Sequence, residues 1–272
     1  MIRELNAEEK TYAIARFAEV PEIGVAAEVV DAFKETMAAS DAVMPDAINE
    51  IFSSANQNKN GCCMIPYTDG KDGAYATFHT FFPKTNVEQL YWWFGWRGLC
   101  SVNYTVSNST HNHSIAMSEE HKRKLCDPFL PEETKIRGVI QSAVKDTGKC
   151  GLEDFIIHLQ RPEEMEVDVK AATEAGCGFV GGWWMREDRA SNQPYKKGID
   201  MFAHVLRQQE DGVAVQSFIW CGYRGLKGHN LRMDTYGPVI DEEYARQIGL
   251  AEAQDMAQLA AILPELYKTA AN

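Results

Sequence analysis

An acidic residue interrupts the apolar side of the last helix that the sequence predicts. The segment from Asp241 to about Lys268 carries residues at three- and four-residue spacing that share one helical face, namely Ile248, Ala251, Asp255, Leu259, Ile262 and Leu266. Since that face turns inward, we expect Asp255 to be at least partly buried. A buried carboxylate needs a metal ion, a cation or several hydrogen-bond donors. The alternative is a frayed helix with Asp255 at the edge of its apolar face.

A short His-Asn-His run is the second place where residue types and spacing suggest chemistry. His111 and His113 lie two residues apart, so on a strand they share one face and could chelate a metal. The alternative is a solvated loop with two surface histidines. We find no glycine-rich phosphate loop, nucleophile elbow, HExxH or CxxC motif.

His204 stands in an alternating apolar segment, where it shares one face with Phe202 and Leu206. If that face lines a cavity, the imidazole is a candidate general acid or base near neutral pH; otherwise it is a satisfied core histidine. Trp184, Trp220 and an aromatic helix that includes Trp93 could stack on a planar ligand or simply form core.

These residues must be positioned by a sheet and a few helices. Residues 1–58 read as a helical part, with a capping box at Asn6 and Glu9, a helical run over Val25–Ala39 and a third helix from near Pro45. A second capping box, Thr85 with Glu88, opens the aromatic helix. The sequence therefore predicts several helices ahead of the first strands.

Residues 59–272 alternate strand-like runs with turn signals and end in the long helix. The expected strands are Gly61–Pro66, Ala74–Phe82, Val102–Val106, Phe155–Leu159, Phe179–Met185, Met201–Arg207 and Val213–Tyr223, with hairpins at DGKDG and QQEDG. No linker separates two domains. We expect one α+β domain over 1–272, with a curved antiparallel sheet around the C-terminal helix and a ligand cavity between them.

Composition limits the class of partner. A net charge of −12 argues against nucleic acid, because phosphate binding needs a basic face. No apolar run reaches the ~20 residues of a membrane span, and the N-terminus lacks a signal-peptide core. Seven cysteines without CxxC spacing fit reduced thiols in a cytoplasmic protein. A small aromatic substrate is the expected partner, and a homo-oligomer is left open.

Several phrases occur in the order found in one family. They are LYWWFGWRGL, NYTVSN, FIIHLQRPEEM, FAHVLRQQEDG leading to SFIWCGY, and LAEAQDMAQLAAILPELY. From about Gly61 to Tyr267 the chain resembles the 2,4-diacetylphloroglucinol hydrolase family, which includes phloretin hydrolase. The resemblance implies a helix-grip fold and a zinc-dependent hydrolysis of the bond between an acyl group and a polyphenol ring.

The metal ligands that the resemblance implies are two histidines and two glutamates, and this chain departs from them. The HxxxE pair of the last helix falls on Ala251 and Asp255, and a glutamate falls on Lys145. The first histidine falls on Asn112 without a gap, and a slip of one residue gives His111 or His113. Alanine and a lysine ammonium offer no lone pair to a metal. We therefore expect that zinc is lost, and hypothesise that the Lys145 ammonium takes the charge position and pairs with Asp255.

The substrate side agrees better with the family, since Tyr104 matches a family tyrosine and His204 matches a further histidine, although Arg97 stands where a histidine is common. Three interpretations remain open. The first is a cofactor-free enzyme on an aryl ketone or polyphenol, with His204, Tyr104, Lys145 and Asp255 as catalytic residues. The second is a zinc enzyme that keeps the hydrolysis with a rearranged site of His111 or His113 together with Glu252 and Asp255. The third is a binding protein without turnover. The expected substrate-binding residues are Trp93, Arg97, Asn112, His113, Trp184, Trp220 and Ala251.

Overall fold

An antiparallel sheet forms the body of the computed structural model, which describes residues 3–66, 72–146, 151–188, 197–233 and 239–270. Its eight strands lie in the order β1-β2-β8-β7-β6-β5-β4-β3. Their bounds are β1 Gly61–Ile65, β2 Gly73–Pro83, β3 Asn112–Ala116, β4 Val139–Asp146, β5 Leu152–Leu159, β6 Cys177–Asp188, β7 Lys197–Gln209 and β8 Gly212–Cys221. Every pairing between neighbouring strands is antiparallel.

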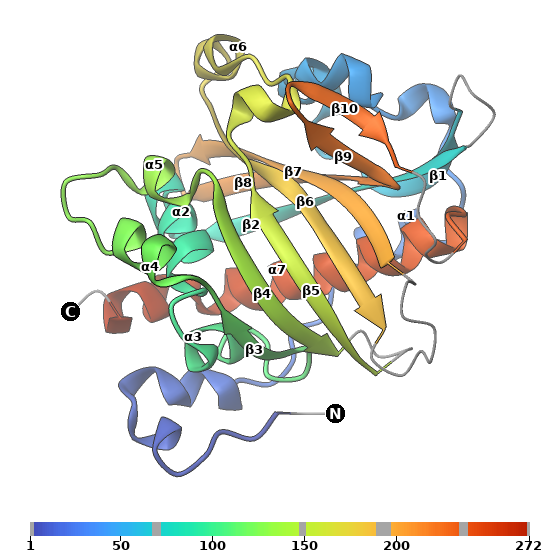
Figure 1. Ribbon diagram of the computed structural model, residues 1–272. Helices are drawn as coiled ribbons and strands as arrows, with labels where there is room; N and C mark the ends of the chain where they lie inside the picture. The colour runs from blue at the N-terminus through green and yellow to red at the C-terminus, as the bar shows by residue number, and fades with distance from the viewer. Residues whose placement is uncertain (1–2, 67–71, 147–150, 189–196, 234–238, 271–272) are drawn as a thin grey trace.

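The long helix α7, Glu242–Ala270, crosses behind this sheet and packs on β1 and β2 (Figure 1). Its buried side chains include Ile248, Leu259, Ile262 and Leu266, which confirms the predicted apolar face and the predicted bounds to within two residues. The helix-grip fold expected for the chain is thus present. Burial of that face, rather than helix propensity, supplies most of the helix's stability.

The two faces of the sheet carry different cores because side chains alternate along each strand. Phe155, Phe202 and Leu206 point toward α7, in a cluster that also holds the buried residues of that helix. Ala203, Phe218 and Trp220 point to the opposite face, where 3₁₀ turns of the N-terminal part cover them. The face that a side chain takes therefore decides whether it can reach the space under α7.

The QQEDG hairpin is confirmed, since β7 ends at Gln209 and pairs with Gly212 at the start of β8. The DGKDG turn lies in part outside the described residues, but the strands on either side of it pair as predicted. Two more strands, β9 Tyr223–Leu226 and β10 His229–Arg232, form a separate small ribbon.

The N-terminal part is less helical than the sequence indicates. The capping box forms, with Asn6 Oδ1 accepting from the Glu9 amide and Glu9 Oε2 accepting from the Asn6 amide. The chain after it forms mostly 3₁₀ turns, together with a helix α1 much shorter than predicted: η1 Glu9–Thr11, η2 Ala13–Glu19, α1 Ala27–Ala32, η3 Ala39–Asp41, η4 Pro45–Phe52 and η5 Ser54–Asn56. Short 3₁₀ turns are common in connecting segments, and here they follow the surface of the sheet.

Two local predictions near the aromatic helix are corrected. Helix α2, Val87–Trp96, is capped by Asn86 with Gln89, one residue beyond the predicted box. The predicted strand Val102–Val106 is instead the short helix α3, Ser101–Thr105. Thr105 Oγ1 lies 3.0 Å from the Ser101 carbonyl and 3.2 Å from the His113 carbonyl, so its hydroxyl can donate within the helix or to β3.

The remaining helices are α4 Glu119–Leu125, α5 Glu132–Ile136, η6 Pro162–Met165 and α6 Val169–Glu174. In Figure 1, α4 and α5 lie beside α2 at one end of the sheet. Across the described ranges, no helix has both the length and the apolarity that a membrane crossing requires.

A buried polar cluster fastens the start of α7 to the sheet. The Tyr244 hydroxyl donates to Asp200 Oδ2 at 2.8 Å, and Trp184 Nε1 donates to the same oxygen at 3.1 Å. The Gly222 amide donates to Asp200 Oδ1 at 3.0 Å. Arg186 Nε reaches the Tyr244 oxygen at 3.1 Å, so a charge balances the buried carboxylate. We call these residues the Asp200 cluster.

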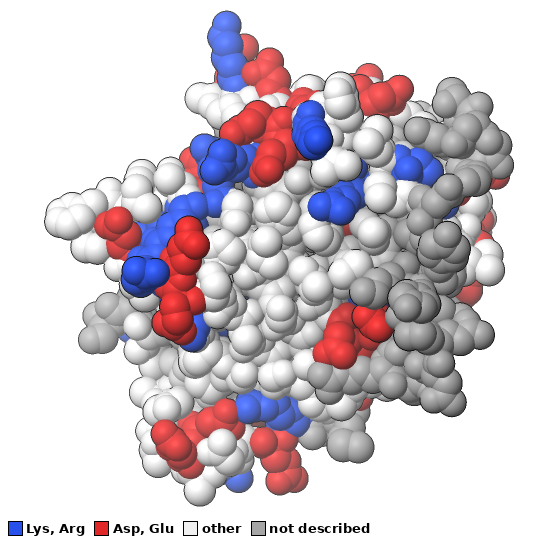
Figure 2. Space-filling model, in the orientation of Figure 1, with Lys and Arg blue, Asp and Glu red and all other residues white. Residues whose placement is uncertain are grey.

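The outer face of β4 and β5 exposes Ile140 and Ile156. Figure 2 shows few charged side chains over the middle of this face and charged ones around it. Lys145, whose side chain is buried, lies on the other side of the sheet, under α7.

Candidate functional site

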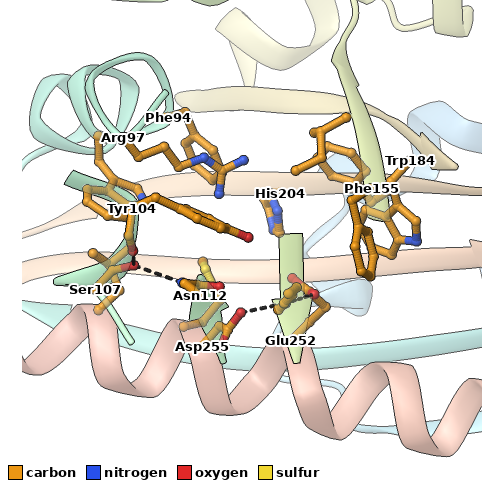
Figure 3. A pocket seen from close by; sticks show the side chains of 16 residues that line it. Phe94, Arg97, Tyr104, Ser107, Asn112, Phe155, Trp184, His204, Glu252 and Asp255 are labelled. Atoms are coloured by element: carbon orange, nitrogen blue, oxygen red, sulfur yellow. Dashed lines mark hydrogen bonds and ion pairs between the residues drawn. The ribbon is translucent and has the colours of Figure 1, made fainter. Parts of the chain in front are cut away.

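A cavity lies between α7 and the inner face of the sheet, and its lining includes residues of α2 and α3 (Figure 3). Its walls combine aromatic rings with charged and polar groups. The lining residues are Trp93, Phe94, Arg97, Tyr104, Ser107, Asn112, Lys145, Phe155, Ile157, Trp184, Phe202, His204, Glu252, Asp255, Met256 and Leu259. Apolar walls with a few convergent polar groups are typical of small-molecule sites.

Lys145 and Asp255 meet on the wall formed by β4 and α7. Lys145 Nζ lies 2.5 Å from Asp255 Oδ2 and 2.6 Å from Glu252 Oε1. The Lys145 side chain is 8% exposed, so both charges of the closer pair are largely screened from solvent by protein. The contact expected between Lys145 and Asp255 is present, and Glu252 completes an ammonium held between two carboxylates.

Asp255 has two further partners, both from the turn before β3. His111 Nδ1 lies 3.1 Å from Asp255 Oδ1, and Asn108 Nδ2 donates to the same oxygen at 2.7 Å. Asn108 was not singled out from the sequence, because an amide in a loop carries no signal of its own. The carboxylate is therefore satisfied on both oxygens.

The pKa values of this cluster follow from burial and charge. Burial disfavours the charged forms of Asp255 and Lys145, but their attraction outweighs it, so the pKa of Asp255 is lowered and that of Lys145 is raised. The hydrogen bond to Asp255 raises the pKa of His111 against its burial. All three shifts favour a charged cluster at neutral pH.

His204 presents a neutral imidazole to the cavity. Burial, with a smaller effect of the Arg97 charge, lowers its pKa to about 3. Its Nδ1 lies 2.9 Å from Ser217 Oγ, and its ring stacks on Phe94 at 5.4 Å between centres. Ser217 was not predicted as a partner of His204. The β7–β8 hairpin implies this pairing, because both residues lie five positions from the Gln209–Gly212 pair that closes the turn.

Tyr104 comes from α3 and is 4% exposed. Figure 3 shows its ring and the His204 imidazole pointing into the same space above Asp255. Its hydroxyl makes no hydrogen bond to any residue in the described ranges, and burial raises its pKa to about 12. The hydroxyl is thus a protonated donor that faces the cavity.

Trp93, Arg97, Asn112 and Trp184 also line the cavity, as expected from the sequence. Three expected substrate-binding residues do not. Trp220 lies on the opposite face of the sheet, where its Nε1 donates to the Val43 carbonyl at 2.7 Å. His113 and Ala251 are half-buried and also lie outside the lining of this cavity.

The donor set does not fit a zinc ion. A zinc site needs about three or four N, O or S ligands, and among the described residues no three His, Cys, Asp or Glu side chains are grouped to hold a metal. His113 lies outside the cavity lining, and both Glu252 and Asp255 face the Lys145 ammonium. A cation carried by the chain thus stands among the residues suggested for a rearranged site.

Comparisons with known proteins show which family this chain belongs to. No curated protein shows a significant match. The solved structure described as "Crystal structure of Ara h 8.0201" matches with a TM-score of 0.35 at 11% identity, covering 68% of this chain and 98% of that chain. The family model described as the DAPG hydrolase PhiG domain matches residues 44–268. The chain therefore belongs to the DAPG hydrolase PhiG domain family.

Proposed function

We propose that the protein is a metal-independent enzyme that acts on an aryl ketone or polyphenol by proton transfer in the cavity. Membership of a family described as a DAPG hydrolase supports hydrolase-type chemistry on a polyphenol such as an acylphloroglucinol, chalcone or flavonoid. The observation that carries the metal-independent part is the Lys145 ammonium, 2.5 Å from Asp255 and 2.6 Å from Glu252.

Three groups divide the work in this proposal. The Lys145 ammonium supplies fixed positive charge that polarises a ketone, less strongly than a divalent ion does. The Tyr104 hydroxyl donates to a phenol or carbonyl oxygen. The neutral His204 accepts a proton from water or a phenol and returns it to the ring carbon that bears the acyl group.

The hydrolysis balances with water alone. Protonation of the ring carbon makes the ring a leaving group, water adds to the acyl carbon, and the bond between them breaks. The products are a carboxylic acid and the polyphenol with hydrogen in place of the acyl group. Isomerisation or ring closure would use the same proton transfers with no change in mass, and elimination would use them with release of a leaving group.

The test is incubation of the purified protein with acylphloroglucinols, chalcones and flavanones, with and without a chelator, and product identification by mass. We expect turnover that the chelator does not change. Addition of water indicates hydrolysis, and an unchanged mass with a new retention time indicates isomerisation. Loss of turnover with chelator and recovery with zinc would contradict metal independence. Ligand recovered unchanged, with thermal stabilisation, would identify a binding protein.

A pair of histidine variants checks the role of His204. We expect His204→Gln to lower kcat by about 10²–10⁴-fold, the usual contribution of a general acid or base. His229→Gln is the matched control, because His229 is exposed on β10, outside the cavity. Equal activities of the two variants would remove His204 from the mechanism.

A further inference from the structure

Arg97 places a guanidinium in the cavity wall. It follows the last residue of α2, and its guanidinium carbon lies 5.1 Å from the centre of the Phe94 ring. In the part of the chain that the structure describes, its side chain makes no ion pair or hydrogen bond, and its Nε is buried without a partner. A buried polar group left in that state destabilises the protein.

The nearby carboxylates do not pair with Arg97. Glu252 and Asp255 both contact Lys145, and Asp255 also accepts from Asn108 and lies against His111. They act on Arg97 only through space, and burial lowers its pKa in spite of them. Among the residues that the structure describes, this guanidinium therefore has no ion-paired or hydrogen-bonded partner.

Asn112, another lining residue, has a hydrogen-bond acceptor without a donor among the described residues. Asn112 donates from Nδ2 to Ser107 Oγ at 3.0 Å, while its Oδ1 is buried and finds no donor among the described residues. Asn112 pairs with Lys145 across β3 and β4. An amide oxygen in this position is complementary to a hydroxyl hydrogen.

We propose that the cavity binds its aromatic ligand as an anion, with Arg97 holding an anionic oxygen and Asn112 accepting a hydrogen bond from a phenolic hydroxyl. The proposal rests on the proposed function for the class of ligand, a hydroxylated aromatic compound, and narrows that class. A guanidinium forms its strongest hydrogen bonds with such oxygens. The anionic oxygen is a ring carboxylate or a phenolate.

The anion also bears on His204, because the Arg97 charge opposes protonation of that imidazole. An anionic ligand would compensate the guanidinium and ease proton uptake by His204. Binding and proton transfer would then be linked through one charge.

The test is equilibrium binding by calorimetry, which needs no turnover, with the first arm at pH 7 and the second over a series of pH values. The first arm compares 2,4-dihydroxybenzoate with 2,4-dihydroxybenzamide, which have similar shapes and differ in charge. The second follows 2,4,6-trihydroxyacetophenone across the ionisation of its phenol. We expect at least tenfold tighter binding of the anion in one arm, and that arm identifies the carboxylate or phenolate source. No preference for the anion in either arm overturns the proposal.

Arginine variants assign the preference to a residue. We expect Arg97→Met to reduce the preference for the anion to less than twofold and to raise the Tm of the ligand-free protein. Arg224→Met is the matched control, because Arg224 lies over the Trp183 ring at 4.2 Å, outside the cavity lining, and should leave the preference unchanged. A preference that survives in Arg97→Met overturns the assignment, whether or not the compounds are turned over.

Discussion

Two clusters around buried or half-buried aspartates flank the cavity, and they differ in what is left unbonded. In the Asp200 cluster, the carboxylate accepts from Tyr244, Trp184 and the Gly222 amide. Around Asp255 the carboxylate is equally well bonded, but the neighbouring Arg97 guanidinium and Asn112 Oδ1 find no partner in the described ranges. A carboxylate alone thus does not separate a structural cluster from a functional one.

What separates them is the set of unsatisfied groups around each aspartate. Native proteins bond nearly all buried polar atoms. Arg97 Nε and Asn112 Oδ1 both belong to residues that line the cavity, so a ligand there can reach two groups that the described residues leave unbonded. Trp184 belongs to both regions, because its indole donates to Asp200 while it lines the cavity. The Asp200 cluster therefore holds one wall of the site in position.

The largest expected effect is on the Asp255 side. Lys145→Met should lower the free energy of unfolding at pH 7 by about 3–5 kcal/mol, because it leaves two carboxylates without their cation. Lys145→Met/Asp255→Leu should recover most of the loss, and denaturant titration measures both. Lys122→Met, which removes a surface pair with Glu119, is the control and should change little. A single variant as stable as the wild type would show that the carboxylates do not depend on Lys145.

A smaller loss of stability with retained activity is expected on the Asp200 side. Asp200→Asn places an amide donor among the donors that face this carboxylate, which should cost about 1–3 kcal/mol in the free energy of unfolding. The change in kcat/KM should stay within about tenfold, since the variant acts only through Trp184. A large loss of activity without loss of stability would contradict this prediction, because the Asp200 cluster would then have a functional role like the residues around Asp255.

The pH dependence of stability distinguishes His204 from a surface histidine. Its folded pKa, about 3, lies below the ordinary unfolded value of about 6.5, so below pH 6.5 the unfolded chain binds more protons there. Stability from this residue is complete above pH 6.5 and falls on acidification. Relative to His204→Gln, the wild type should lose about 2 kcal/mol between pH 6.5 and pH 5. The raised pKa of His111 makes its contribution to stability change with pH in the opposite direction. Wild type and His204→Gln both contain His111, so its contribution cancels when their stabilities are subtracted. Parallel pH profiles would contradict a neutral His204.

The smallest effects come from the tryptophans on the two faces of the sheet. Trp184→Phe loses the hydrogen bond to Asp200 and should weaken ligand binding several-fold by calorimetry. Trp220→Phe loses the bond to the Val43 carbonyl, costing about 1 kcal/mol in the free energy of unfolding. Ligand affinity should not change in Trp220→Phe. Weaker ligand binding in this variant would mean that the two faces are coupled.

The sequence predicts best where a feature is local and periodic. The α7 stripe placed Asp255 inward because helical spacing alone determines a face, and the β7–β8 turn sets the pairing of His204. The Lys145 contact came from its position in a family pattern, since nothing in AVKDTG distinguishes a buried lysine from a solvated one.

Other features depend on long-range register and were missed. Trp184 and Trp220 look alike in the sequence, but only the pairing of all the strands shows that they point to opposite faces. The Ser101–Thr105 helix has strand-like residues and is held by bonds and packing that the sequence does not display. The unsatisfied state of Arg97 is likewise a property of the assembled cavity.

The positive charge beside Asp255 belongs to a side chain of β4. This charge is part of the polypeptide, so every folded copy of the chain holds an ammonium at the same place between the strand and the last helix.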